Sequence, residues 1–169
     1  MSDERAARAA DDLERTGAAI DALMRSTPRE RWAARPAPDA WSPVVVVHHL
    51  LVEERRDFRP RLESTFADPT KEWAPIDPEG WAREVDEGAD LVEMLDAFVA
   101  ERATSLTWLR GLSSPDWGAT YQHPLIGALS AADLLASWVM HDALHLRQLL
   151  GLHAQAATDF GSTGYAGSW

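Results

Sequence analysis

The chain has 169 residues, a formal net charge of −11 at pH 7 and no cysteine. Its length fits one ordinary domain, which can bury a sufficient core without crosslinks. The lack of cysteine excludes disulfides, thiolate metal ligands and a cysteine nucleophile, and the acidic composition argues against nucleic acid or an anionic membrane as a partner.

The first predicted element is a helix from about Asp3 to Met24, in which Ala6, Leu13 and Ile20 recur at helical spacing with charged residues opposite them. The start of the chain is charged and lacks the apolar run of a signal peptide. No later stretch reaches the roughly 18 uninterrupted apolar residues that a membrane span requires. We therefore expect a cytoplasmic protein.

A second helix is predicted within residues 41–66, because Ser42 suits an N-cap and Pro43 suits the first helical turn. The four valines at 44–47 would favour a strand by propensity alone. The cap, the proline and the charged, helically periodic stretch that follows favour a helix whose amino end is buried.

The third predicted helix covers about Asp90 to Leu112, and its apolar stripe includes one charged residue, Arg102. The fourth begins at Ser130 with the capping-box-like sequence S-A-A-D and ends near Gly151. No alternation of Val, Ile and Thr bounded by hairpin turns is present. An all-α four-helix bundle is therefore the predicted fold.

The last residues, AATDFGSTGYAGSW, are small, rich in glycine and aperiodic. We therefore divide the chain into a bundle over residues 1–153 and a flexible C-terminal tail over residues 154–169. The connections between the second, third and fourth helices are long, and loops of such length often carry function.

His141 and His145 are four residues apart in the fourth helix, so they project from one face about one turn apart. This spacing lets two imidazoles bind one ion. Both fall on the apolar face, where unsatisfied ring nitrogens would cost stability. The alternative is that one or both lie at the helix edge as solvated or singly hydrogen-bonded residues.

His49 lies on the predicted buried part of the second helix, one turn before Glu53, where a third imidazole could meet the pair. Three neutral imidazoles hold zinc, nickel, iron or manganese with at least one open position, which is typical of a catalytic site. Asp142 and Gln148 are weaker candidates for outer partners of these ligands. His123 is expected to anchor a loop.

Arg102 must find an anion or carbonyl groups, because a guanidinium within an apolar stripe is costly to bury alone. The sequence favours a structural salt bridge to an acidic residue, with Glu53, Glu54, Asp57 and Asp142 as candidates. The functional alternative is a clamp for a substrate carboxylate near the metal.

Four motifs together resemble the DinB/YfiT-like family of metal-binding four-helix proteins. They are W-S-P-x4-H-H-L at 41–50, Phe98 with Arg102, H-P-L-I-G-A-L-S-A-A-D-L-L at 123–135 and H-D-x-x-H-L-R-Q-L at 141–149. The resemblance covers roughly residues 5–152. It implies an up-down-down-up bundle with long crossover loops, and homodimers.

The resemblance also implies the metal ligands: a histidine eight residues after Trp41, which is His49, together with His141 and His145. His48, the neighbour of His49, points about 100° away around the helix. Zinc or nickel is the expected ion, with iron or manganese as alternatives.

Family members with an assigned activity include thiol-dependent S-transferases and a thiol-dependent maleylpyruvate isomerase. The resemblance therefore predicts a transferase that acts on a small-molecule substrate with a low-molecular-weight thiol activated at the metal, while Arg102 or a loop residue steers the electrophile. One alternative is a metal-dependent hydrolase with Glu53 as general base to a metal-activated water. Another is a non-catalytic module that binds metal or a small molecule, its ion tying two helices together.

Overall fold

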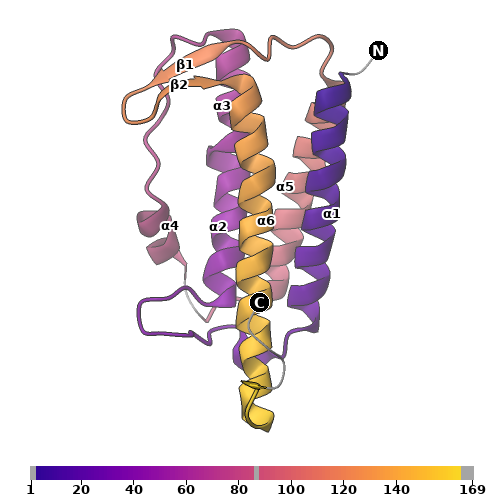
Figure 1. Ribbon diagram of the computed structural model, residues 1–169, viewed down its shortest axis with the longest axis vertical. Coiled ribbons are helices and arrows are strands. Elements are labelled where there is room, and N and C mark those ends of the chain that lie inside the picture. Colours follow the sequence, from indigo (N-terminus) through magenta and orange to yellow (C-terminus); the bar gives the residue numbers. More distant parts are fainter. Residues whose placement is uncertain (1–2, 86–87, 165–169) are drawn as a thin grey trace.

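The computed structural model describes residues 3–85 and 88–164 (Figure 1). Its helices are α1 (Glu4–Ser26), α2 (Pro43–Arg56), α3 (Phe58–Ala67), α4 (Pro78–Glu84), α5 (Leu91–Gly111) and α6 (Ala131–Gln155). Two 3-10 helices, η1 (Arg29–Arg31) and η2 (Ala156–Phe160), and two strands, β1 (Thr120–His123) and β2 (Gly127–Ser130), complete the described elements.

The predicted four-helix bundle is confirmed, with α2 and α3 stacked end to end as one of its four members (Figure 1). α1 packs against α5 and α6, and the α2–α3 pair packs against the same two helices from the other side. α1 and α6 run in one direction, and α2, α3 and α5 run in the other (Figure 1). Within the described ranges, none of these helices is long and apolar enough to cross a membrane.

The stretch predicted as one helix over 41–66 is divided at Asp57, whose φ of −119° and ψ of −94° interrupt the helix. Pro60 explains the break, because it lacks the N–H that would donate to the carbonyl of Arg56 and its ring crowds that carbonyl.

The four valines at 44–47 lie in α2 and are almost fully buried, so packing overrides their preference for strands. Ser42 occupies the N-cap position, as predicted, but its hydroxyl makes no cap hydrogen bond. Instead its carbonyl accepts a bond from the N–H of Val46. Pro43 at the first position pre-sets the helical backbone there.

The long connections contain regular structure that the sequence analysis did not predict. β1 and β2 form an antiparallel hairpin, with Thr120 opposite Ser130 and His123 opposite Gly127. His123 anchors its turn, since its Nδ1 accepts from the N–H groups of Leu125 and Ile126. Gly127, with a φ of +80°, supplies the left-handed conformation that the turn needs.

The expectation of no strands was wrong because these strands have only four residues each and almost no β-branched side chains. Tyr121 of β1 stacks on Trp73 of the preceding connection, with 4.0 Å between ring centroids. The hairpin thus fastens the loop after α3 to the end of the bundle. In α4, the side chain of Asp77 caps the helix by accepting from Gly80 N–H.

The fourth helix extends further than predicted. α6 continues four residues past Gly151 to Gln155, and η2 follows it directly. Asp159 of η2 forms an ion pair with Arg31 of η1 at 2.8 Å. The predicted boundary between 153 and 154 therefore falls inside α6. The flexibility of the tail stays a prediction, and residues 165–169 lie outside the described ranges.

The core consists of two apolar clusters, one at each end of the bundle. One contains Leu13, Leu62, Leu109 and Trp138, and the other contains residues such as Ile20, Leu50, Phe98 and Leu149. Between the two clusters, α2, α5 and α6 carry a layer of buried polar side chains. Its most buried members are His49, Glu53, Glu54, Arg102, Ser105 and Asp142.

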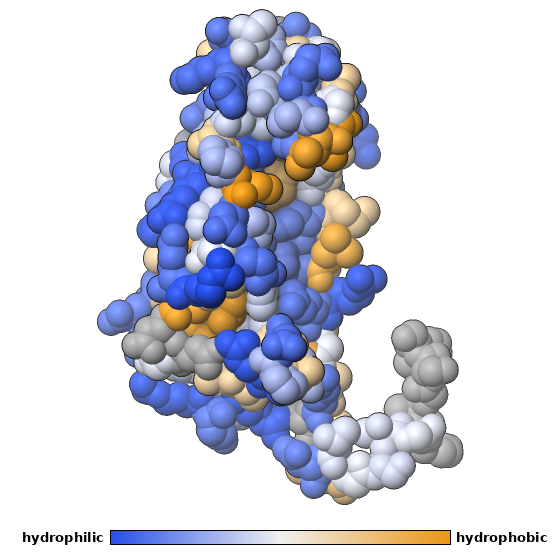
Figure 2. All heavy atoms as spheres, turned by 90° about the vertical axis from the view of Figure 1, so that its left-hand side faces the viewer, coloured by the Kyte–Doolittle hydropathy of each residue, from blue (hydrophilic) through white to orange (hydrophobic). Residues whose placement is uncertain are grey.

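The face that carries α4 and the hairpin is mostly hydrophilic, and its apolar patches are separate from one another (Figure 2). Leu125 and Ile126 at the hairpin turn are 88% and 67% exposed. Such a surface agrees with the acidic composition of the chain.

The cap of α6 offers a direct test of how the hairpin joins the bundle. Ser130 Oγ accepts from Asp133 N–H, and the Asp133 carboxylate accepts from Ser130 N–H, which forms the predicted capping box. We expect Ser130→Ala to lower the free energy of unfolding by about 0.5–2 kcal/mol in urea titrations. Ser137→Ala is the control, because that hydroxyl bonds only to the Asp133 carbonyl one turn earlier. Equal stability of the two variants would contradict the role of the cap.

Candidate metal centre

Three imidazole rings from α2 and α6 converge within the buried polar layer. His141 Nε2 lies 3.1 Å from His49 Nε2 and 3.1 Å from His145 Nε2. One ligand atom from each of the three rings lies within 4.8 Å of the others, so the group could hold a metal ion. His49 is 3% exposed, and the other two rings are partly buried.

Hydrogen bonding between the rings cannot satisfy all three nitrogens. Burial lowers the pKa of His49 and of His141 to about 3, so both rings are neutral at pH 7. A neutral His141 Nε2 carries either one hydrogen or one lone pair, so only one of its two close contacts can be a hydrogen bond. A shared cation would accept all three lone pairs, and at a tetrahedral zinc bound at about 2.0–2.1 Å the ligand nitrogens are separated by about 3.3 Å. The donor set therefore fits a divalent ion.

The surroundings of the rings fix their orientation. His145 Nδ1 is 2.8 Å from Gln148 Oε1, which makes Nδ1 the protonated nitrogen and leaves the Nε2 lone pair facing the other rings. Trp41 lies parallel to the His145 ring, at 6.2 Å between centroids, and Phe58 lies 5.1 Å from the His141 ring. Aromatic side chains thus border the three rings on two sides.

His48 points away from this group, as the helical angle to His49 requires. Its ring is half-buried and lies beside Trp81 and Glu84 of α4. The structure therefore brings His49, and not His48, to the pair on α6.

Glu53 lies beside the rings, with its Oε1 3.6 Å from His49 Nε2. Burial, helped by a hydrogen bond with Asp57, raises the pKa of Glu53 to about 9. Asp57 in turn pairs with Arg61, whose guanidinium lies over the Trp73 ring at 4.6 Å. A polar chain therefore runs from the rings along α2 and α3 to the loop after α3.

Arg102 is occupied by the structural contacts that its sequence position suggested. Its Nε donates to Glu54 Oε1 at 2.7 Å, and its Nη1 donates to Asp142 Oδ2 at 2.6 Å and to the carbonyl of Leu13 at 2.8 Å. Ser105 Oγ donates to the second Glu54 oxygen. The guanidinium thus ties α1, α2, α5 and α6 together, and it makes no contact that supports a substrate clamp.

All three rings, Glu53 and both outer candidates were predicted from the sequence. Gln148 is the partner of His145, whereas Asp142 serves Arg102. The positions of Trp41 and Phe58 beside the rings and the role of Gly17 were not predicted. A Cβ built at Gly17 would lie 3.3 Å from Arg102 Nη1, so a glycine at this position makes room for the guanidinium. Nothing in the local sequence signals this contact, because it joins residues far apart in the chain.

Removal of the Arg102 charge should destabilise the bundle strongly. We expect Arg102→Met to cost about 3–5 kcal/mol of unfolding free energy, because it leaves two buried carboxylates unpaired. Arg110→Met is the matched control on the same helix, since Arg110 forms exposed pairs with Asp11 and Glu14 that contribute at most about 1 kcal/mol. Chemical denaturation measures both, and a loss at Arg102 no greater than at Arg110 would refute the structural role.

Comparison with known proteins agrees with this architecture. The structure is similar to that of YfiT from Bacillus subtilis, which is described as a probable metal-dependent hydrolase with an unusual four-helix bundle topology; the TM-score is 0.80 at 19% identity, over 93% of this chain and 90% of that one. It is also similar to TT2238, described as a four-helix bundle protein, with a TM-score of 0.56 at 21% identity over 85% and 97% of the two chains. The search among curated proteins gave no significant match. The family model of the DinB superfamily matches residues 12–149, and the chain belongs to that superfamily.

Proposed function

We propose that this chain is a metal-dependent enzyme whose divalent ion is held by His49, His141 and His145. The observation that carries the proposal is the convergence of three imidazole nitrogens, in which His141 Nε2 lies 3.1 Å from each of the other two. Nitrogen ligands of this kind suit zinc or nickel, with iron or manganese as alternatives.

A divalent ion bound there would supply a Lewis acid that polarises a substrate and lowers the pKa of a water or thiol nucleophile. Three protein ligands leave at least one coordination position open, as in catalytic sites. Gln148 holds the His145 ring in the tautomer that binds, and Trp41 and Phe58 limit access of bulk water from their sides.

Hydrolysis is the reaction that the geometry supports best. Glu53 is a buried carboxyl group 3.6 Å from the ring of His49, within reach of a nucleophile beside the three nitrogens. Burial raises the pKa of Glu53, and a cation bound beside it would lower that pKa. The two effects together suit a group that takes a proton near neutral pH. YfiT, with a similar fold, is described as a probable metal-dependent hydrolase.

Thiol transfer is the second candidate, and it rests on the resemblance of the motifs, which implies a thiol-dependent activity. The chain has no cysteine, so the thiol would have to come from a low-molecular-weight cosubstrate. In this reaction Glu53 would take the proton of the thiol, and the electrophile would approach from the same side. Thiol-induced changes in the visible spectrum of the cobalt-loaded protein would favour this reaction over hydrolysis.

A purely structural ion is the third candidate, and the two apolar clusters argue against it. The apolar clusters at each end and the Arg102 contacts hold α2 and α6 in place without help from the ring nitrogens.

Homodimer formation also stays a prediction. Exposed Met140, Leu144 and Leu150 on α6 provide apolar surface for it.

The ligand assignment predicts that His145→Ala loses the metal and keeps the fold, because one turn of α6 loses a single partly buried ring. Elemental analysis after zinc loading should fall from one ion per chain to less than about 0.1, while the helical circular dichroism signal is unchanged. His48→Ala is the control and should keep its zinc, since its ring faces α4. Loss of zinc in the His48 variant, or retention in the His145 variant, would overturn the assignment.

The hydrolytic role predicts that Glu53→Gln keeps the zinc and loses turnover. With p-nitrophenyl acetate as an activated ester probe, we expect a rate at least about 100-fold below that of the zinc-loaded parent, which is the usual contribution of a general base. Glu63→Gln on the exposed face of α3 should leave the rate unchanged. A parent protein without zinc-dependent turnover, or a Glu53 variant with the full rate, would count against hydrolysis.

A further inference from the structure

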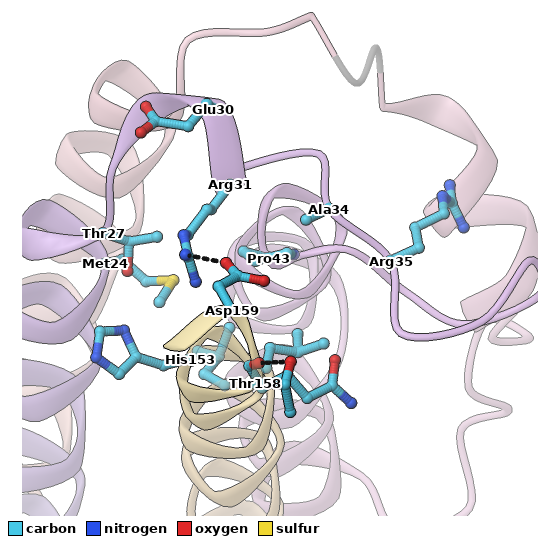
Figure 3. A pocket seen from close by; sticks show the side chains of 13 residues that line it. Met24, Thr27, Glu30, Arg31, Ala34, Arg35, Pro43, His153, Thr158 and Asp159 are labelled. Atoms are coloured by element: carbon cyan, nitrogen blue, oxygen red, sulfur yellow. Dashed lines mark hydrogen bonds and ion pairs between the residues drawn. The ribbon is translucent and has the colours of Figure 1, made fainter. Parts of the chain in front are cut away.

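A cavity lies at the end of the bundle opposite the hairpin, where α1, η1, the start of α2, the end of α6 and η2 meet (Figure 3). Its volume is about 440 Å³, which is within the range of small-molecule sites. None of the three ring ligands lines it, and neither does Glu53. It is therefore separate from the metal centre.

One part of the cavity wall is apolar. Met24, Pro43, Leu149 and Leu152 line it, and they come from three different helices. Met24 and Leu149 are almost fully buried, so this wall is part of the rigid core. It offers a preformed surface for a short hydrocarbon chain.

The charged part of the wall centres on Arg31. Its guanidinium is 2.8 Å from a carboxylate oxygen of Asp159, and the two side chains point toward each other across the cavity (Figure 3). The Arg31 side chain is 30% exposed, whereas that of Asp159 is 66% exposed. Asp159 belongs to the short η2, so the anion on Arg31 comes from an exposed segment beyond the bundle.

An exposed ion pair of this kind contributes little to stability, so another carboxylate can take the place of Asp159. Besides this pair, the charged lining contains Arg35 and Glu30. Once Asp159 is displaced, the Arg31 guanidinium is the charged group beside the apolar wall, and it attracts an anion, whereas the side chains of Arg35 and Glu30 point away from it (Figure 3). Arg35 is itself anchored, since its Nη1 donates to the carbonyl of Ala40.

We propose that this cavity binds a small organic monocarboxylate with a short apolar chain. The carboxylate pairs with Arg31 in place of Asp159, and the chain packs on Met24, Leu149 and Leu152. In this arrangement η2 is an internal competitor of the ligand. The site is independent of the metal chemistry proposed above.

The test uses hexanoate as the probe and follows backbone amide shifts of the full-length protein by nuclear magnetic resonance. We expect saturable shifts at residues of η1 and the end of α6. Acetate, which lacks the chain, and 1-hexanol, which lacks the charge, should each bind at least about tenfold more weakly.

Two substitutions with opposite effects make the test specific. Arg31→Gln should weaken hexanoate binding about tenfold, because a charge-assisted contact is lost. Asp159→Asn should strengthen binding about two- to fivefold, because the competing carboxylate is gone. Arg147→Gln, an equal charge change on the exposed face of α6, should leave the affinity unchanged, and circular dichroism checks that each variant is folded.

The proposal is overturned if hexanoate produces no saturable shifts in either the parent or the Asp159 variant. It is also overturned if Arg31→Gln binds as tightly as Arg147→Gln, because the carboxylate would then sit elsewhere. Unchanged affinity in Asp159→Asn would also overturn it, because the carboxylate of the ligand would then not replace Asp159 on Arg31.

Discussion

The arrangement of the bundle depends on one buried guanidinium. Arg102 sits between the two apolar clusters and binds Glu54 of α2, Asp142 of α6 and the backbone of α1. Burial of these charges is costly unless every one is paired, so a rotation of α2, α5 or α6 about its axis would be penalised. The ion-pair layer therefore fixes the faces that these helices present to one another.

This constraint also assembles the metal centre. Glu54 and Asp142 are the sequence neighbours of Glu53 and His141, and adjacent residues point about 100° apart on a helix. Because Glu54 and Asp142 face Arg102, Glu53 and His141 face the adjoining space between α2 and α6. His49, one turn before Glu53, and His145, one turn after His141, point to the same space. The site is thus organised by contacts that need no ion.

The sequence predicted most of this bundle because its signals are local and periodic. Helical spacing located the four long segments, and the i, i+4 spacing placed His141 and His145 on one face. The approach of His49 from another helix came from motif resemblance, since periodicity alone gives no contact between distant segments. The break at Asp57 was within reach, because Pro60 is visible in the sequence, whereas the hairpin was missed because its strands are short and lack β-branched residues. The contact of Gly17 with Arg102 depends on tertiary packing and has no local signature.

The central claim is that one divalent ion binds where the three rings converge. A crystal structure of the zinc-loaded protein, with anomalous data collected above and below the zinc absorption edge, tests it most directly. The account predicts a single strong anomalous peak about 2.0–2.1 Å from Nε2 of His49, His141 and His145, with a further position open to solvent or ligand. Three rings in their present positions with no peak between them, or a peak at other residues, would contradict it.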